Sequence, residues 1–214
     1  MKYKKDLVSI ILNCFNGSEY LKDALISIQN QTYKNWELIF WDNCSKDSSK
    51  EILQSFKNKK FKNFLSKKHT SLYAARNLAL TKAKGKFISF IDSDDMWESD
   101  KLKKQIQLFK EKNVAVVYGN SWIKKEKTNQ KKIFIRKKMK EGYIHNDLLK
   151  SYNVGILTAV IRRSFLKGKK IFDDKYNIIG DFDFFIKLSK KYKLRIIQSP
   201  VATYRIHEKN LSIL

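Results

Sequence analysis

Apolar runs of strand length alternate with segments of helical periodicity through the first half of the chain. Runs rich in β-branched and aromatic residues predict strands, the third of them weak, at residues 7–13, 36–42, 61–65, 87–91 and 114–118. Apolar side chains three or four positions apart predict helices between them, at residues 19–31, 48–56, 72–83 and 100–112. Repeated strand–helix–strand units are typical of an α/β fold with a mostly parallel sheet flanked by helices.

The alternation changes after Gly119. The lysine-rich stretch that ends at Lys140 is expected to form a loop or a hairpin. The later part predicts a strand, a helix and two short edge strands, at residues 155–161, 182–192, 195–197 and 201–206. The edge strands flank Pro200, the only proline, which lacks a backbone donor. Because no repeat or linker composition interrupts the chain, we expect one continuous domain over residues 1–214.

Composition restricts the class of protein further. With 214 residues, 43% of them hydrophobic, the chain can bury one good core. No apolar run approaches the roughly 18 residues that span a bilayer. The basic amino terminus lacks a signal-peptide apolar region and cleavage site, so we expect a cytoplasmic protein. Cys14 and Cys44, the only cysteines, have no C-x-x-C spacing and are expected to be free thiols.

The formal net charge of +24 needs a physical explanation. It comes from 39 Lys and only 6 Arg, whereas paired hydrogen bonds to bases and phosphates depend on Arg. The lysines are concentrated at residues 57–68, which contain no acid, and at residues 124–140, where Glu126 is the only acid. A solvated surface explains part of this charge. For the rest we favour a basic face against an anionic membrane over nucleic-acid binding.

Three carboxylates directly follow the predicted strand at residues 87–91. They belong to Asp92, Asp94 and Asp95, at the edge of an open α/β sheet where ligands bind. Clustered carboxylates are costly unless a cation neutralises them, and Asp92 and Asp94 share one face of an extended chain. Both could therefore bind one divalent ion. The alternative is a solvated aspartate-rich turn that caps the next helix.

The order of motifs resembles that of the family 2 glycosyltransferases, enzymes of GT-A fold that use nucleotide-diphosphate sugars. The resemblance covers residues 7–95 and reappears around Asp181 and His207. It implies a Rossmann-like sheet in residues 1–120 that binds the nucleotide sugar. Residues 121–214 would then form a small acceptor-side region.

The donor side of this resemblance begins in the loop after the first strand. In the family this loop holds the nucleotide base, and Phe15 and Asn16 match it, whereas Asn13 and Cys14 depart from it. An aromatic ring can stack on a base. An ordinary Asn-Gly turn would explain the same residues.

Two further residues match donor-binding positions. Asp42 corresponds to an aspartate that accepts hydrogen bonds from the base or ribose, although Asn43 and Cys44 stand where the family usually has Asp-Gly. A turn or helix cap is its alternative role. Arg76 corresponds to an arginine that approaches the nucleotide and supports the aspartate loop, and its alternative is a surface arginine.

The acidic residues match the D-x-D motif of the family. The resemblance assigns Asp92 to the ribose or metal shell, Asp94 to direct metal binding and Asp95 to holding the loop. It implies Mn²⁺ or Mg²⁺, which would offset charge on the departing nucleoside diphosphate. His207 resembles a carboxyl-terminal histidine near the diphosphate or metal, so it is a second candidate metal ligand. His69 has no such context.

The expected general base is Asp181. In inverting members a carboxylate deprotonates the acceptor hydroxyl, and Asp181 falls on that position at the start of a helix. Gly180 replaces the usual glutamate, and a helix N-cap is the alternative role of Asp181. No Gln-x-x-Arg-Trp sequence, the signature of processive members, occurs. Transfer of a single sugar is therefore expected.

The resemblance thus implies a metal-dependent inverting glycosyltransferase of surface polysaccharide synthesis. We expect a UDP-sugar donor, a lipid-linked or oligosaccharide acceptor, and no nucleic-acid partner. One alternative is a basic nucleic-acid-binding module, which explains the charge but not the order of motifs. The other is a degenerate family member kept for binding, which the departures at Asn13, Asn43, Cys44 and Gly180 would support.

Overall fold

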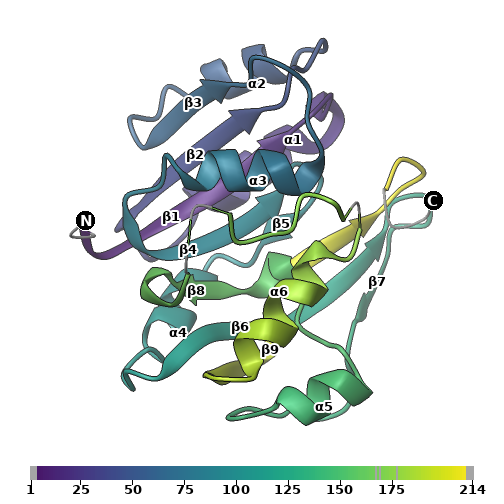
Figure 1. The fold of residues 1–214 in the computed structure, drawn as a ribbon. Helices are drawn as coiled ribbons and strands as arrows, with labels where there is room; N and C mark the ends of the chain where they lie inside the picture. Colours follow the sequence, from purple (N-terminus) through teal and green to yellow (C-terminus); the bar gives the residue numbers. More distant parts are fainter. Residues whose placement is uncertain (1–3, 167, 169, 177, 211–214) are drawn as a thin grey trace.

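The computed structural model describes residues 4–166, 168, 170–176 and 178–210. In this part of the chain, the strands form one nine-stranded sheet in the order β3-β2-β1-β4-β8-β6-β9-β5, with β7 attached to β6 (Figure 1). The strands are β1 (Lys4–Cys14), β2 (Trp36–Asp42), β3 (Phe61–Leu65), β4 (Gly85–Asp92), β5 (Met96–Trp97), β6 (Val114–Lys125), β7 (Gln130–Ile133), β8 (Val160–Arg162) and β9 (Lys193–Ile206). The helices are α1 (Ser18–Gln29), α2 (Ser49–Ser55), α3 (Leu72–Leu80), α4 (Lys101–Ile106), α5 (His145–Lys150), α6 (Gly180–Ser189) and the 3₁₀ turns η1 (Ile156–Thr158) and η2 (Arg163–Phe165).

The first four strands form a parallel unit with β1 between β2 and β4. The third strand, β3, pairs in parallel with the outer side of β2. Register aligns the carboxyl ends of the central strands, because Cys14 pairs with Asp42 and Asn13 pairs with Asp92. The predicted strand–helix alternation of this half is confirmed, and it brings three loops to one edge of the sheet.

The middle of the sheet differs from a simple continuation of that alternation. The short strand β8 lies antiparallel between β4 and β6, so β6 does not lie beside β4. The strand expected at residues 155–161 is in part wrong, since η1 precedes a strand that begins only at Val160. Val160 and Ile161 are fully buried at the centre of the sheet. The hydrophobic pattern of a segment indicates that it is buried, but it does not indicate which distant strands it pairs with.

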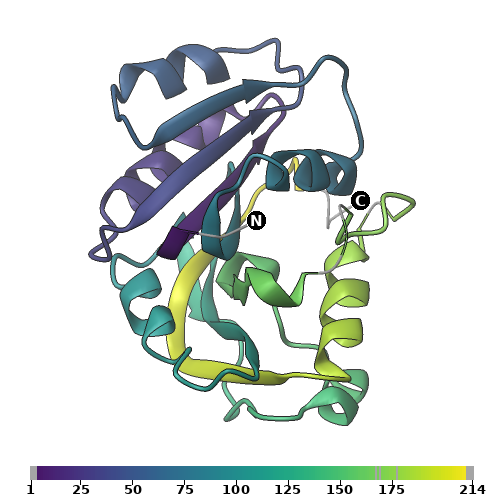
Figure 2. The same cartoon turned by 60° about the vertical axis from the view of Figure 1, so that its left-hand side comes forward.

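The prediction of two short edge strands around Pro200 is wrong. Residues Lys193–Ile206 form one strand, β9, which lies between β6 and β5 and bends as it crosses the molecule (Figure 2). The register of the β6–β9 pairing shifts on both sides of Asn120, the partner of Pro200. Such an irregularity accommodates the missing proline donor within a continuous strand. A loop or a hairpin was expected for the lysine-rich stretch, and the structure shows a hairpin, β6–β7.

Two apolar cores lie on the two faces of the sheet. Helices α1, α2 and α4 cover one face through Leu21, Leu53 and Leu102. Helices α3, α5 and α6 cover the other face, which is the near face in Figure 1. Strand β1 contributes to both cores, because alternate side chains point to opposite faces. The loops that leave the carboxyl ends of the strands are therefore held from both sides.

Some helix boundaries differ from the expectation. Helix α4 ends at Ile106, because the next residues form tighter i→i−3 bonds, from Leu108 N to Gln105 O and from Phe109 N to Ile106 O. Helix α6 begins at Gly180, two residues earlier than expected. Among the helices of the described residues, none is long and apolar enough to cross a bilayer. Residues 1–3 of the basic amino terminus lie outside the described residues.

Lys101 is a fully buried cation near the start of α4. Its Nζ donates to Gln105 Oε1 at 2.8 Å and to Ser89 Oγ at 3.2 Å, and it lies 4.2 Å from the Trp97 ring centroid. Burial holds the pKa of Lys101 well below its ordinary value of 10.5. Neutral partners and an aromatic face replace water here, so the charged form is disfavoured.

We expect Lys101→Met to increase the free energy of unfolding by about 1–4 kcal/mol near neutral pH. The unfolded chain binds more protons than the folded one between the lowered pKa and 10.5, so wild-type stability rises with pH in that window. The advantage of the variant should therefore shrink toward pH 10. Urea unfolding at several pH values measures this, with the exposed Lys103→Met as control. A pH-independent difference would contradict the account.

Candidate active site

The loops after β1 and β2 interlock at the carboxyl edge of the sheet. Asn16 Oδ1 accepts a hydrogen bond from Lys46 N at 2.8 Å, and Asn16 N donates to Ser45 Oγ at 3.0 Å. The loop after β1 also touches the acidic turn, since a Cβ on Gly17 would come within 2.6 Å of Ser93 Oγ. The Asn16 side chain thus fixes the neighbouring loop. Its predicted contact with a base stays a prediction.

An exposed aromatic ring stands at the rim of these loops. Phe15 is 49% exposed, and its ring centroid lies 4.1 Å from that of His69 with the planes tilted by 44°. The Asn43 side chain holds the His69 loop by donating to Thr70 O at 2.8 Å and accepting from Thr70 N at 3.2 Å. His69, which lacked a context in the sequence, therefore belongs to the same surface as Phe15. The loop following β2 is the element that places it there.

Asp42 is buried at the end of β2. Its Oδ1 accepts a hydrogen bond from Ser45 N at 2.8 Å, so the turn role considered from the sequence is present. Cys14, its partner across the sheet, is a buried free thiol, and burial raises its pKa. Cys44 is also free. The expectation of free thiols agrees with this arrangement, and the nucleotide role of Asp42 stays a prediction.

Arg76 connects α3 to the end of β4. Its Nη2 lies 2.6 Å from Asp92 Oδ1, and the side chain is only 3% exposed. The rings of Tyr73 and Phe90 lie 5.5 and 6.0 Å from the guanidinium carbon. Burial alone would lower the pKa of Arg76, but the Asp92 carboxylate outweighs it and the net shift is upward. The surface-arginine alternative is wrong, because this cation is buried against the first carboxylate of the acidic turn.

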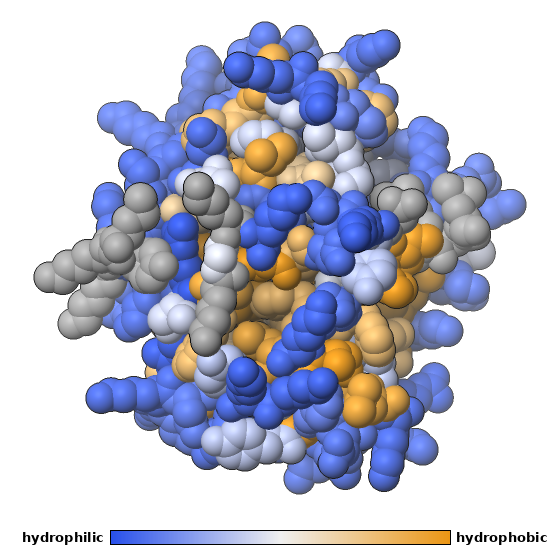
Figure 3. Space-filling view, in the orientation of Figure 1, coloured by the Kyte–Doolittle hydropathy of each residue, from blue (hydrophilic) through white to orange (hydrophobic). Residues whose placement is uncertain are grey.

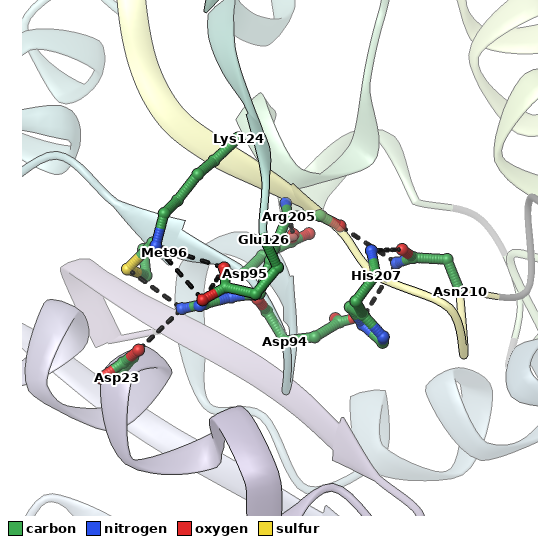
Figure 4. A network of polar contacts seen from close by, with 9 residues as sticks. All are labelled: Asp23, Asp94, Asp95, Met96, Lys124, Glu126, Arg205, His207 and Asn210. Carbon is green, nitrogen blue, oxygen red and sulfur yellow. Dashed lines mark hydrogen bonds and ion pairs between the residues drawn. The ribbon is translucent and has the colours of Figure 1, made fainter. Parts of the chain in front are cut away.

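Asp94 and His207 meet across the same edge (Figure 4). His207 Nε2 lies 2.9 Å from Asp94 Oδ2, and Asn210 Nδ2 donates to the same oxygen at 3.2 Å. Burial and the nearby Asp92 charge raise the pKa of Asp94. Two residues predicted from separate motifs as metal ligands are therefore in direct contact.

Arg205, in β9, ties the acidic turn to Glu126 and to helix α1 (Figure 4). Its Nε donates to Asp94 O at 2.8 Å, and its backbone N donates to Asp95 Oδ1 at 2.9 Å. Its Nη atoms form ion pairs with Glu126 at 2.8 Å and with Asp23 on α1 at 2.7 Å. The guanidinium is 3% exposed. No motif in the sequence indicated a role for this residue, which holds the turn in place.

Within the described residues, no three His, Cys, Asp or Glu side chains are arranged to hold a metal ion. Asp94 and His207 provide two such side chains, a carboxylate and an imidazole that lie 2.9 Å apart. Burial is the main cause of the raised pKa of Asp94, and the Asp92 charge adds to it. Mg²⁺ is commonly held by one or two side chains together with substrate phosphates and water. This pair fits a divalent ion that is shared with a diphosphate, and does not form a complete protein cage.

Asp181 lies in the first turn of α6, facing α3. Tyr73 Oη lies 3.2 Å from its Oδ1 and donates to Ile178 O at 2.7 Å. A Cβ on Gly180 would come within 2.8 Å of the Tyr73 ring, so glycine is what lets this ring pack against the helix start. Burial raises the pKa of Asp181, and Arg76 opposes the shift. The departure at Gly180 is thus matched by Tyr73, which the sequence did not indicate.

Several buried polar atoms near these residues have no hydrogen-bond partner among the described residues. Both amide atoms of Asn13 are of this kind, between Trp41 and Asp92 in the sheet register. Tyr152 Oη and Asn153 Oδ1 also lack a hydrogen-bond partner among the described residues. Buried polar groups are normally hydrogen-bonded, so these atoms are available to a ligand or to ordered water. Asn13 was noted only as a departure from the family pattern.

The parallel half of this sheet carries carboxylates and a buried arginine at its carboxyl edge, which is where open α/β folds bind their ligands. The model of glycosyl transferase family 2 matches residues 9–189. An uncharacterized glycosyltransferase of Haemophilus influenzae is 34% identical over 199 residues, which cover 92% of this chain and 77% of that protein. The chain belongs to glycosyl transferase family 2.

Two other relatives have names that describe a role. The putative teichuronic acid biosynthesis glycosyltransferase TuaG of Bacillus subtilis is 34% identical over 162 residues, covering 74% of this chain and 63% of TuaG. The UDP-Glc:alpha-D-GlcNAc-diphosphoundecaprenol beta-1,3-glucosyltransferase WfgD of Escherichia coli is 34% identical over 160 residues, covering 75% of this chain and 62% of WfgD. The chain thus spans a little under two thirds of the length of these two proteins.

Solved structures agree on the fold. The crystal structure of S. aureus TarS 1-349 in complex with UDP superposes with a TM-score of 0.77 at 20% identity, covering 93% of this chain and 60% of that one. The mannosyltransferase PcManGT from Pyrobaculum calidifontis, in complex with GDP-Man and Mn²⁺, superposes with a TM-score of 0.66 at 15% identity, covering 95% and 58%. The predicted α/β fold of GT-A type is confirmed.

We expect Arg205→Gln to lower the free energy of unfolding by about 3 kcal/mol, because it removes a buried cation from several acceptors. Arg195→Gln is the matched control. Arg195 also pairs with two carboxylates, Glu111 and Glu141, but it is 31% exposed and its loss should cost less than about 1 kcal/mol. Urea unfolding of both variants measures the difference. Equal losses would contradict the central role of Arg205.

Proposed function

We propose that this chain is a metal-dependent inverting glycosyltransferase that moves one sugar from a UDP-sugar to a hydroxyl of a lipid-linked or oligosaccharide acceptor in surface polysaccharide synthesis. The observation that carries the proposal is the buried Arg76 at the end of β4, which pairs with Asp92 at 2.6 Å. The ring of Tyr73 lies 5.5 Å from its guanidinium carbon, and the hydroxyl of Tyr73 lies 3.2 Å from Asp181 Oδ1. The proposed donor-side and acceptor-side acids are thus connected through two neighbouring side chains of α3.

The donor side is supported by the loops at the carboxyl edge of the sheet. Phe15 presents an exposed ring for a base to stack on, and Asp42 presents a buried carboxylate for a base or ribose donor. Asp92, which Arg76 holds in place, is proposed to contact the ribose. Structures of this fold with UDP and with GDP-Man exist among its neighbours. UDP is proposed because WfgD, a relative that is 34% identical, is named for a UDP-Glc donor.

Asp94 and His207 are proposed to hold Mn²⁺ or Mg²⁺ together with the diphosphate. When bound, such an ion stabilises negative charge on the leaving nucleoside diphosphate. Asn210 and Arg205 hold Asp94 through its carboxylate and its carbonyl oxygen, respectively. Electrostatic catalysis depends on such groups being held in place before the ligand binds.

Asp181 is proposed to remove the proton from the acceptor hydroxyl. Burial raises its pKa, which makes the carboxylate a stronger base than an exposed aspartate. The hydroxyl of Tyr73 fixes its orientation. Because the deprotonated form is active, the rate of transfer is expected to fall as the pH drops through the raised pKa of Asp181.

We expect Asp94→Ala to abolish the Mn²⁺-dependent part of UDP binding while the fold is retained. The test is calorimetric titration of UDP with Mn²⁺ and with EDTA, together with far-UV circular dichroism. Asp100→Ala, an exposed acid whose ion pair with Lys104 lies on the helix surface, is the control. Full metal-dependent affinity in Asp94→Ala would show that the ion is held elsewhere.

We expect Asp181→Asn to bind UDP as the wild type does and to lose sugar transfer by at least about 100-fold. Release of UDP from UDP-glucose, with a lipid-diphosphate-linked GlcNAc as acceptor, measures transfer. Asp183→Asn, two residues further along α6, is the control. Near-normal turnover in Asp181→Asn would place the base elsewhere. UDP binding without turnover in the wild type would favour the degenerate, non-catalytic alternative.

A further inference from the structure

Tyr20, in the first turn of α1, presents an aromatic ring to the segment that carries His207. Its ring centroid lies 4.7 Å from that of the His207 imidazole, with the planes tilted by 42°, and 4.5 Å from the guanidinium carbon of Arg205. We propose that Tyr20 is a positioning residue, which holds the His207 imidazole where it can bind a divalent ion. This role rests on the proposed function, in which Asp94 and His207 hold the ion, and no motif in the sequence indicated it.

The start of α1 is itself fixed, so Tyr20 is presented from a defined position. Ser18 N donates a hydrogen bond to Asp47 Oδ2 at 2.8 Å, which joins the first residue of the helix to the loop after β2. Leu21 is fully buried in the core beneath α1 and sets the rotation of the helix. Tyr20, its neighbour, is half-buried at the side of the helix. The ring therefore has a fixed anchor that does not belong to the acidic turn.

On the other side of the contact, Arg205 holds the ring by its charge. Arg205 and His207 are two residues apart at the end of β9, and alternate residues of an extended chain point to the same side. Arg205 also pairs with Asp23 on α1 at 2.7 Å. A guanidinium close to an aromatic ring is attracted to its face, most strongly where water is excluded. One tyrosine ring thus contacts a buried cation and the imidazole of the proposed metal ligand.

The polar contacts of the His207 imidazole cannot all persist when it binds an ion. Its Nε2 lies 2.9 Å from Asp94 Oδ2, and its Nδ1 accepts a long hydrogen bond from Lys209 N at 3.3 Å. Once Nε2 and the carboxylate both bind one ion, their bond to each other is lost. The contact with Tyr20 uses the imidazole ring and neither nitrogen. It is therefore compatible with the free and the ion-bound state, and it limits rotation of the imidazole in both.

A neighbouring ion pair does not provide the same support. Glu19 Oε2 lies 2.9 Å from Lys209 Nζ, but the two side chains are 52% and 80% exposed. Hydrophilic side chains cover much of the periphery of the face drawn in Figure 3, and ion pairs in such surroundings are screened by water and salt. The hydroxyl of Tyr20 hydrogen-bonds to this exposed Glu19. The aromatic ring, and not its hydroxyl, is thus the part of Tyr20 that acts on His207.

Calorimetric titration of UDP with Mn²⁺ and with EDTA tests this role. Tyr20→Leu should weaken the Mn²⁺-dependent affinity by about tenfold, as expected when the support behind a metal ligand is lost, and leave the affinity in EDTA unchanged. Tyr20→Phe keeps the ring and should bind as the wild type does. Tyr33→Leu is the matched control, because Tyr33 packs against the same core as α1 but bonds to Asp6 O near the start of β1.

The position of the imidazole is measured separately by NMR of isotope-labelled histidine in the metal-free protein at a single pH. Tyr20→Leu should move the ring resonances of His207 toward those of a free histidine, because the neighbouring aromatic ring is lost. The resonances of His69 and His145 should stay in place, and Tyr20→Phe should resemble the wild type. Far-UV circular dichroism checks the fold, and Tyr20→Met replaces Tyr20→Leu if the latter does not fold.

The outcomes separate this role from the proposed function. Wild type without Mn²⁺-dependent UDP binding would overturn the proposed function and the Tyr20 assignment that rests on it. Metal-dependent binding that Tyr20→Leu leaves unchanged would overturn the Tyr20 assignment alone. An unmoved His207 resonance, or an equal loss in Tyr33→Leu, would do the same. Weaker UDP binding by Tyr20→Leu in EDTA would show that Tyr20 acts through the donor loop, which also overturns the assignment.

Discussion

The buried guanidinium of Arg205 is the interaction on which the acidic edge of the sheet depends. Three carboxylates within four residues would repel one another, and burial already raises the pKa of Asp94 and Asp95. Arg205 bonds to the backbone of one and, through its own backbone, to the carboxylate of the other. Because Arg205 lies in β9, this contact also delivers His207 to the turn two residues later. The strand and the acidic turn are therefore positioned by one another.

The two halves of the chain contribute different parts of the candidate site. The parallel strands bring the donor-side loops together through register alone, since the ends of β1, β2 and β4 are aligned. Asp181 and His207 come from the later half and reach the same region through Tyr73 and Asp94, respectively. The register of neighbouring strands positions the loops after β1, β2 and β4, whereas tertiary contacts position Asp181 and His207. A single substitution can thus disturb Asp181 or His207 without disturbing the loops after β1 and β2.

The sequence predicted what depends on local pattern. The parallel strands, the helices between them and the hairpin after Gly119 followed from periodicity. The insertion of β8 beside β4 and the continuity of β9 through Pro200 did not, because both are decided by partners far away in sequence. Motifs indicated the individual candidate site residues, and their roles stay predictions. The residues that hold them in place, such as Tyr73, lie on helices. Core residues and site residues recur there with the same helical spacing, so the sequence pattern does not distinguish them.

The residues that depart from the family pattern make specific contacts in this structure. Gly180 leaves room for the Tyr73 ring, whose hydroxyl then orients Asp181, so loss of the usual glutamate is accompanied by another support for the base. Asn43 fixes the loop that carries His69 beside Phe15. Gly180 and Asn43, which replace the usual residues, are thus each accompanied by specific contacts. A site that had lost its activity would not be expected to keep such contacts. The arrangement of these side chains therefore favours an active enzyme over a binding remnant.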